Sequence, residues 1–205
     1  YYDYTSIQPA GSWDLMESNA TPPQMTNSLF KYKYLNWFDS IPQLTDSGRY
    51  TIQSLATGPN RAYKIASRNS NQWYILEYRN TSDRFDATIP GRGLLVWRYN
   101  DVYNADNAGF NDDTPHEMWL FRPGSNNDFT QGDIAAAAFG VNSRNPFGPN
   151  SNPHPYLCSG TSDNSFELTD IAVSADYSSV SFTFHPLGLE GCGDVSQYPH
   201  RQGFE

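Results

Sequence analysis

The apolar positions of the chain follow a helical period near its beginning. The stripe consists of Met25, Leu29, Tyr32 and Asn36, broadened by Phe30, Tyr34 and Trp37. Asn19 or Thr21 is suited to cap a helix there, and Pro22 and Pro23 suit its first turn. The pattern predicts one helix ahead of Pro42, and core packing explains most of its aromatic stripe.

The period changes to two after Gly48, which is typical of strands. The predicted strands are 50–55, 62–66, 72–78, 93–99, 116–121, 166–173 and 180–185. The segment 93–99 is almost continuously apolar, which indicates a central strand covered on both faces. Two later strands, 166–173 and 180–185, are expected to pair through a turn at Ala175 and Asp176. We therefore expect an α+β fold of mostly antiparallel strands with one clear helix near the N-terminus.

The composition narrows the class of protein. The chain of 205 residues has a formal net charge of −9 and only 17% charged residues, while aromatic residues reach 15%. So acidic a chain is a poor partner for nucleic acid, which needs a basic surface, and no apolar run has the roughly 20 residues of a membrane helix. The chain opens Tyr-Tyr-Asp-Tyr without a Met or an apolar leader, so we expect a mature or excised piece of a longer protein.

Two cysteines, Cys158 and Cys192, lie in polar, glycine-containing stretches. A disulfide between them would close a long loop and stabilise the fold by roughly 4 kcal/mol. The alternative is two unpaired thiols. Because disulfides persist in oxidising compartments, a bridge would favour a secreted or cell-surface protein.

No complete catalytic set can be identified from the residues alone. The four histidines are His116, His154, His185 and His200, and none belongs to an HExxH motif. Each is better explained by a structural role than as a metal ligand.

The loop 100–113 is rich in side-chain oxygens. Its carboxylates are Asp101, Asp106, Asp112 and Asp113, with no Lys or Arg among them. Such a density of oxygens suits calcium, although the spacing is not that of an EF-hand. The alternative is a solvated, turn-rich loop.

The order of several short motifs resembles the secreted immune-inhibitor-A-type zinc metallopeptidases, which are related to the metzincins. The motifs are the opening Tyr-Asp segment at Asp3, Gly11-Ser-Trp-Asp-Leu-Met, Lys33-Tyr-Leu-Asn-Trp, Tyr74-Ile-Leu-Glu-Tyr-Arg with Phe85-Asp86, and Gly91-Arg-Gly-Leu-Leu-Val-Trp-Arg. Asn36 and Arg98 depart from the family pattern, which more often has Gly and His there. The similarity covers about residues 1 to 185.

This resemblance implies the C-terminal half of a metzincin-like catalytic domain, followed by β-rich structure. Met16 would form the floor beneath the zinc, Trp13 and Asp14 would shape the turn and the substrate wall, and Asp3 would be a third zinc ligand or orient one. The zinc helix, with two histidines and the general-base glutamate, is absent from the chain. In the intact protein, zinc would activate a water for peptide hydrolysis. The present chain would contain no catalytic residue and would need the missing N-terminal half as its partner.

The expected organisation has three parts. Residues 1–48 would hold the methionine turn and helix of the catalytic domain, residues 49–185 a β-rich domain with long loops, and residues 186–205 a tail tied back by Cys192. Peptide or protein would be the substrate. The rival interpretation is a non-catalytic β-rich module that binds glycans or a protein surface, since many aromatics with Asn/Asp-rich loops are also typical of carbohydrate-binding surfaces.

Overall fold

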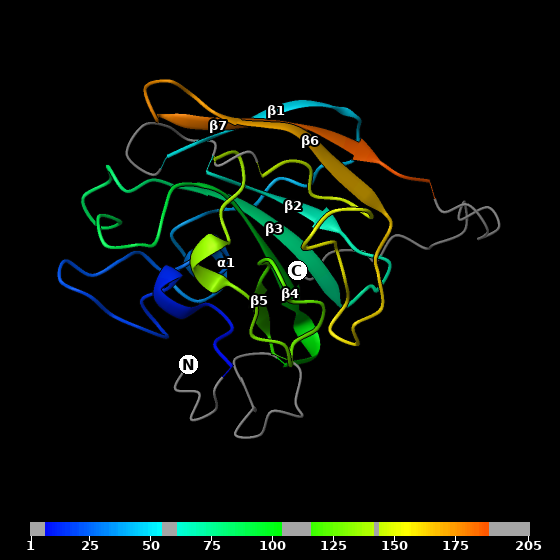
Figure 1. Cartoon of the computed structure of the whole chain (residues 1–205), viewed down its shortest axis with the longest axis horizontal. Helices are drawn as coiled ribbons and strands as arrows, with labels where there is room; N and C mark the ends of the chain where they lie inside the picture. The colour runs from blue at the N-terminus through cyan, green and yellow to red at the C-terminus, as the bar shows by residue number, and fades with distance from the viewer. Residues whose placement is uncertain (1–6, 55–60, 104–115, 142–143, 189–205) are drawn as a thin grey trace.

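Two antiparallel sheets form the two layers of the molecule (Figure 1). The computed structural model describes residues 7–54, 61–103, 116–141 and 144–188. The four-stranded sheet has the order β2-β3-β4-β5, with β2 Ala62–Ala66, β3 Gln72–Arg79, β4 Gly93–Asn100 and β5 Met118–Leu120. The three-stranded sheet has the order β1-β7-β6, with β1 Gly48–Gln53, β6 Phe166–Val173 and β7 Ser179–Pro186.

The described helices are short. α1 spans Ser28–Lys33, and the 3-10 helices are η1 Gly11–Trp13, η2 Asp101–Tyr103 and η3 Ile134–Ala136. Within the described ranges, no helix has the length and apolar character needed to cross a membrane.

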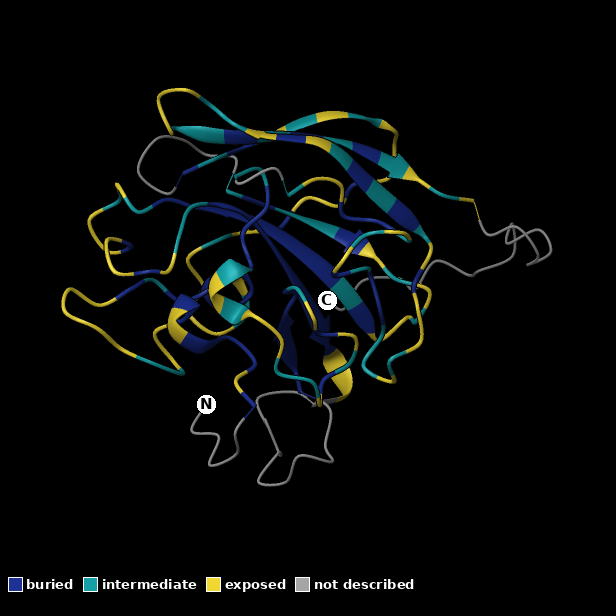
Figure 2. Cartoon of the chain, in the orientation of Figure 1, coloured by how far each residue is buried: buried dark blue, intermediate teal, exposed yellow. Residues whose placement is uncertain are grey.

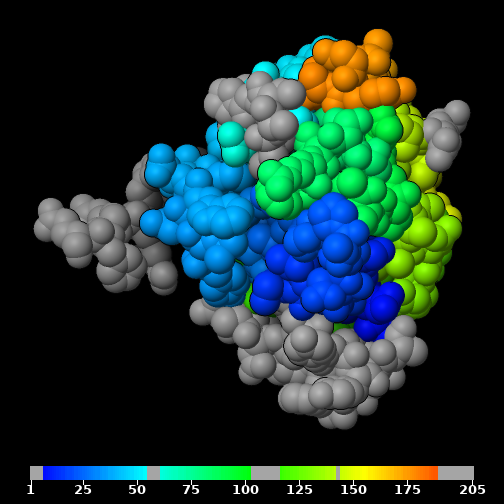
Figure 3. Space-filling view, turned by 90° about the vertical axis from the view of Figure 1, so that its left-hand side faces the viewer, coloured from blue at the N-terminus to red at the C-terminus, as the bar shows by residue number. Residues whose placement is uncertain are grey.

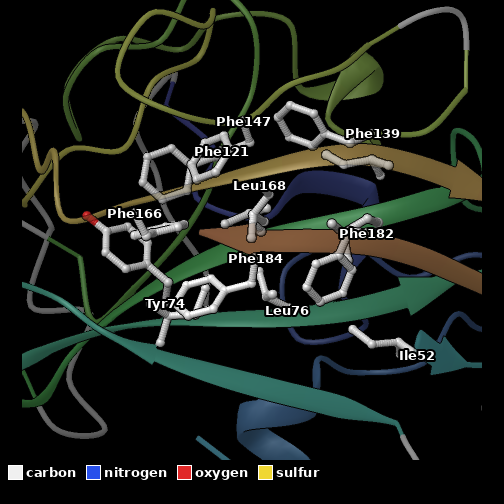
Figure 4. Close-up of a cluster of buried hydrophobic side chains, with 14 of the residues drawn as sticks. Ile52, Tyr74, Leu76, Phe121, Phe139, Phe147, Phe166, Leu168, Phe182 and Phe184 are labelled. Carbon is white, nitrogen blue, oxygen red and sulfur yellow. The ribbon is translucent and has the colours of Figure 1, made fainter. Parts of the chain in front are cut away.

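The main core fills the space between the two sheets (Figure 4). The three-stranded sheet contributes residues such as Phe166, Leu168 and Phe182, which face Tyr74 and Leu76 of the other sheet. Alternate residues of β6 and β7 are buried, and the others are partly or fully exposed. The outer face of this sheet therefore contacts solvent, as the yellow and teal positions in Figure 2 show.

A second core covers the opposite face of the four-stranded sheet. Trp13, Leu29 and Phe30 pack there with Leu95 and Trp97 of β4. All eight residues of β4 are buried, which confirms the prediction that the segment 93–99 is covered on both faces. The N-terminal segment and α1 thus cover the face of the four-stranded sheet that the other sheet does not.

The strand predictions agree closely with the structure. β2 and β6 have the predicted bounds, and the others differ by at most two residues at either end. β6 and β7 form the expected antiparallel pair, interrupted by a bulge between Thr169 and Ala172. In the middle of this bulge, Asp170 has a φ of 50°. The mostly antiparallel architecture with one α-helix is therefore as expected.

The predicted start of the helix was wrong. Asn27 caps α1 by accepting a hydrogen bond from the Phe30 amide at 3.0 Å, so Asn19 and Thr21 are not its caps. Pro22, Pro23 and Met25 lie before the helix in a non-helical stretch. The prediction that core packing explains most of the aromatic stripe was also wrong. Leu29 and Phe30 are buried in the second core, whereas Tyr32, Tyr34 and Trp37 are 42%, 41% and 60% exposed.

Candidate functional site

The segment around Trp13 is anchored to the four-stranded sheet. η1 ends at Trp13, whose side chain is fully buried and whose Nε1 donates to the carbonyl oxygen of Ile134 at 2.7 Å. Trp13 therefore belongs to the second core.

Asp14 holds the following turn from beneath. Its buried carboxylate accepts hydrogen bonds from the Met16 amide at 2.8 Å, the Asn27 amide at 2.7 Å and Asn27 Nδ2 at 2.6 Å, and Thr26 Oγ1 adds a fourth donor at 3.1 Å. Burial raises the pKa of Asp14, and these hydrogen bonds oppose that shift. Asp14 thus joins the two ends of the segment 14–27.

Met16 and its neighbour Leu15 lie at the surface. Met16 is 52% exposed and Leu15 is 38% exposed. The resemblance implied a hydrophobic floor at Met16, and the structure places this side chain on a fixed turn with half of its area accessible.

Arg79 connects the N-terminal segment to β3. Its Nε donates to Asp86 Oδ2 at 2.6 Å and its Nη2 to Asp86 Oδ1, so the two groups form a forked ion pair. Nη1 also donates to the Trp13 carbonyl oxygen at 3.0 Å, and Nη2 to the Met25 carbonyl oxygen at 2.9 Å. One buried guanidinium therefore fixes both sides of the segment 14–27.

Glu77, two residues earlier on β3, fixes the start of α1. Its Oε2 accepts from the Ser28 amide at 2.7 Å and from Ser28 Oγ at 2.6 Å. Its Oε1 accepts from Trp97 Nε1 at 3.0 Å and lies 3.4 Å from Arg79 Nη1. Three buried carboxylates, at positions 14, 77 and 86, therefore lie between the N-terminal segment and β3, and each accepts several hydrogen bonds.

Lys31 of α1 belongs to the same buried cluster but is held differently. The residue is 1% exposed, and its Nζ has no hydrogen-bond partner among the described residues. Burial lowers the pKa of Lys31 to about 8, against the opposing effect of Glu77. Lys31 lines a pocket of about 500 Å³, which we name the Lys31 pocket. Its lining consists of Met25, Lys31, Trp37, Phe38, Arg61, Asp83, Arg84 and Phe85.

The Lys31 pocket lies where three parts of the chain meet. Figure 3 shows the face on which the N-terminal segment (dark blue), the segment after α1 (lighter blue) and the segment after β3 (green) adjoin. None of these segments has regular secondary structure over its whole length. The buried hydrogen bonds of Asp14, Arg79 and Asp86 therefore hold the walls of the pocket in place.

The calcium and zinc predictions fall mostly on residues outside the described ranges. Asp3, Asp106, Asp112 and Asp113 lie there. Asp101 is described: it accepts from the Tyr99 hydroxyl at 2.6 Å and lies 3.9 Å from Lys33 Nζ. The calcium site therefore stays a prediction.

The described residues do not fit a zinc ion. Within them, no group of three or more His, Cys, Asp and Glu side chains could hold a metal, whereas zinc takes four ligands in structural sites and three protein ligands in catalytic ones.

Cys158 is half-buried and has no disulfide partner among the described residues. Its amide donates to Gln72 Oε1 at 2.9 Å, and Gln72 Nε2 donates to its Sγ at 3.2 Å. Cys192 lies outside the described residues, so the disulfide stays a prediction.

Comparison with known proteins gives no further guidance, because no family model, curated protein or solved structure matches the chain. The resemblance to zinc peptidases therefore stays a prediction.

The sequence pointed to Trp13, Asp14 and Met16 as one segment, whose role at a zinc site stays a prediction, and it did not indicate the environment of Lys31. The available signal was weak: a lysine between Phe30 and Tyr32 in a mostly apolar helix. Glu77, Arg79 and Asp86 do stand in the motifs that carry the resemblance, and the structure shows that they form one buried network.

Proposed function

We propose that this chain is a portion of a secreted zinc-dependent endopeptidase and is inactive in peptide hydrolysis by itself. The observation that supports the proposal best is the turn after Trp13. Its backbone is fixed by the buried Asp14, while Leu15 and Met16 present apolar side chains outward.

The arrangement of this turn favours a contact surface. Burying a carboxylate is costly unless donors surround it, so the four donors around Asp14 indicate a turn of defined conformation. A rigid turn that exposes a methionine can support a neighbouring polypeptide at little additional entropic cost. The zinc ligands would come from that polypeptide, and the present chain would supply the support and part of the substrate wall.

Activity and metal content together test the proposal. We expect the purified chain to cleave denatured casein no faster with zinc than with a chelator. We expect material isolated from the native source to include a polypeptide with HExxH, to contain one zinc and to show chelator-sensitive cleavage. Native material that consists of this chain alone, without zinc, would contradict the proposal, and so would chelator-sensitive cleavage by the pure chain.

A matched pair of variants tests the role of the turn in the native assembly. Met16→Ser should lower zinc content and activity together, because it alters the surface beneath the metal. Leu15→Ser changes the neighbouring exposed side chain and should leave both close to wild type. Equal effects from the two variants would remove the specific role of Met16.

The second candidate is a non-catalytic binding module, which exposed aromatics favour. Trp37 is 60% exposed, Phe85 46% and Tyr34 41%, and two of them line the Lys31 pocket. Glycan binding by the pure chain that Trp37→Ala abolishes would favour the module over the peptidase portion.

A further inference from the structure

The walls of the Lys31 pocket are apolar, while its charged groups are mainly cationic. Met25, Trp37, Phe38 and Phe85 supply the apolar surface. Lys31, Arg61 and Arg84 carry positive charge, and Asp83 is the one acidic residue of the lining. This local excess of positive charge is unusual in a protein with a net charge of −9.

Lys31 lies at the base of the pocket, because it is a lining residue of which only 1% is exposed. The charged groups that influence it are Glu77 and Arg79 on β3, Asp86 on the segment after β3, and Asp14 on the N-terminal segment.

Each of these carboxylates already accepts hydrogen bonds from groups other than Lys31. Asp86 accepts from Arg79 and from the Met25 amide. Glu77 accepts from Ser28, Trp97 and Arg79.

The side chain of Lys31 therefore keeps its hydrogen-bonding capacity unused among the described residues. An ammonium group with three donors and no acceptor is expensive to bury, and an anion that pairs with it in good geometry offsets part of that cost. The lowering of the Lys31 pKa to about 8 is consistent with this missing partner.

We propose that the Lys31 pocket binds the carboxylate of a ligand with an apolar or aromatic body, with Lys31 as the group that pairs with the carboxylate. The aromatic walls would contact the body of the ligand, and Arg61 and Arg84 would attract it electrostatically. A monoanion fits better than a phosphate dianion, because one buried amine supplies the charge at the base and Asp83 opposes further negative charge. This site is independent of the proposed peptidase function.

Two sources can supply this chemistry: a free small carboxylic acid and the C-terminus of a peptide that ends in an aromatic residue. Both present a carboxylate next to an apolar group.

Titration calorimetry of the pure chain with 3-phenylpropanoate and with 3-phenylpropanamide at pH 7 tests the charge requirement. The acid should bind at least tenfold more tightly than the uncharged amide. Acetyl-Gly-Gly-Phe, as the free acid and as the C-terminal amide, forms the second arm. Preferential binding of either acid supports the proposal and identifies the source, and equal binding of acid and amide in both arms overturns it.

Lys31→Met keeps the length of the side chain and removes the charge, so it should reduce acid binding at least tenfold. Lys64→Met is the matched control, because it removes the same charge from a lysine that does not line the pocket. Lys64 Nζ lies 5.1 Å from the centroid of the Trp73 ring instead. Unchanged binding by a folded Lys31→Met protein would overturn the proposal.

The pH dependence of the wild-type protein gives a readout that does not require the variant to fold. Binding of the acid requires the ammonium form, so affinity should fall about tenfold per pH unit above the Lys31 pKa of about 8. At pH 8.5, binding should take up protons, which calorimetry in two buffers of different ionisation enthalpy detects. An affinity that stays constant from pH 7 to pH 10, without proton uptake, would contradict the assignment of Lys31.

Discussion

Glu17 and Asp14, three residues apart, are both carboxylates of the N-terminal segment, but their environments differ. Asp14 has four donors around it, whereas Glu17 Oε1 is buried without a hydrogen-bond partner among the described residues. Glu17 Oε2 accepts from the Ala10 amide. Burial raises the pKa of Glu17 to about 7, although hydrogen bonds from the backbone of Ala10 and Gly11 oppose the shift.

Glu17→Gln should therefore stabilise the protein at neutral pH relative to wild type. The folded state keeps a proton on Glu17 up to about pH 7, while the unfolded chain releases it near its ordinary pKa of 4.5. The contribution of Glu17 to stability is thus fully present below pH 4.5 and is lost as pH rises through 7. Glutamine can still accept from Ala10 without the cost of ionisation.

Urea unfolding at pH 4.5 and pH 7.5 measures this effect. The advantage of Glu17→Gln should grow by about 1–3 kcal/mol between the two pH values, following the conversion of pKa shifts to free energy. Asp46→Asn removes the same charge from an exposed position and controls for net charge. A difference between Glu17→Gln and wild type that is equal at both pH values would exclude a raised pKa.

At this scale, the sequence predicted only part of the candidate site. Trp13, Asp14 and Met16 were identified because they are contiguous and stand in a motif. Lys31 was not identified. The carboxylates near Lys31 lie on β3 and on the segment after β3, and they accept hydrogen bonds from other parts of the chain. Only the tertiary structure shows which donors these carboxylates have. A sequence lists these charges but does not show which remain unpaired.

At the scale of the elements, the backbone of β4 lies unusually close to the segment after η3 at the first residue of the strand, Gly93. Gly93 has a φ of 143°, and a Cβ at this position would lie 2.3 Å from the Phe139 carbonyl oxygen. The chain approaches closely here because Leu94 and Phe139 exchange backbone hydrogen bonds at 2.9 and 3.0 Å. This bridge attaches the segment after η3 to the central strand.

Gly93→Ala should destabilise the protein by about 2–4 kcal/mol, because overpacking and backbone strain add. Gly188→Ala is the matched control, since nothing lies within 4 Å of a Cβ there, and it should cost less than about 0.5 kcal/mol. Thermal or urea unfolding of the two variants measures the difference. Equal stability of the two would show that the Leu94–Phe139 bridge adapts without strain.

The strands were predicted well because apolar runs bounded by turn residues are a local signal. β7 alternates between buried and partly exposed positions, whereas β4 is buried at every position and was recognised by its continuous apolar run. The helix start was missed because a proline pair and an apolar run look the same in a helix and in an irregular segment that packs on a sheet. The contacts of Asp14 with Thr26 and Asn27 decided between the two.

At the scale of the whole molecule, the predicted disulfide would tie the C-terminal tail to the β-rich body. We expect no free thiol in the unfolded, unreduced protein, since Cys158 and Cys192 are its two cysteines. Thiol titration in denaturant measures this, and a reduced sample should give two thiols per chain. Two thiols without reduction would remove both the bridge and its support for export.

The pairing of β1 with β7 constrains the order in which the chain can fold. β2, β3, β4 and β5 pair with neighbours in sequence and can assemble as they emerge from the ribosome. β1 is synthesised before all of them, yet its partner in the described sheet is β7, with Gly48 opposite Phe184. Contacts between such distant segments slow folding, and unpaired strands are prone to aggregation. During translation, the aromatic face of the four-stranded sheet is therefore not fully covered by the three-stranded sheet until residue 186 has left the exit tunnel.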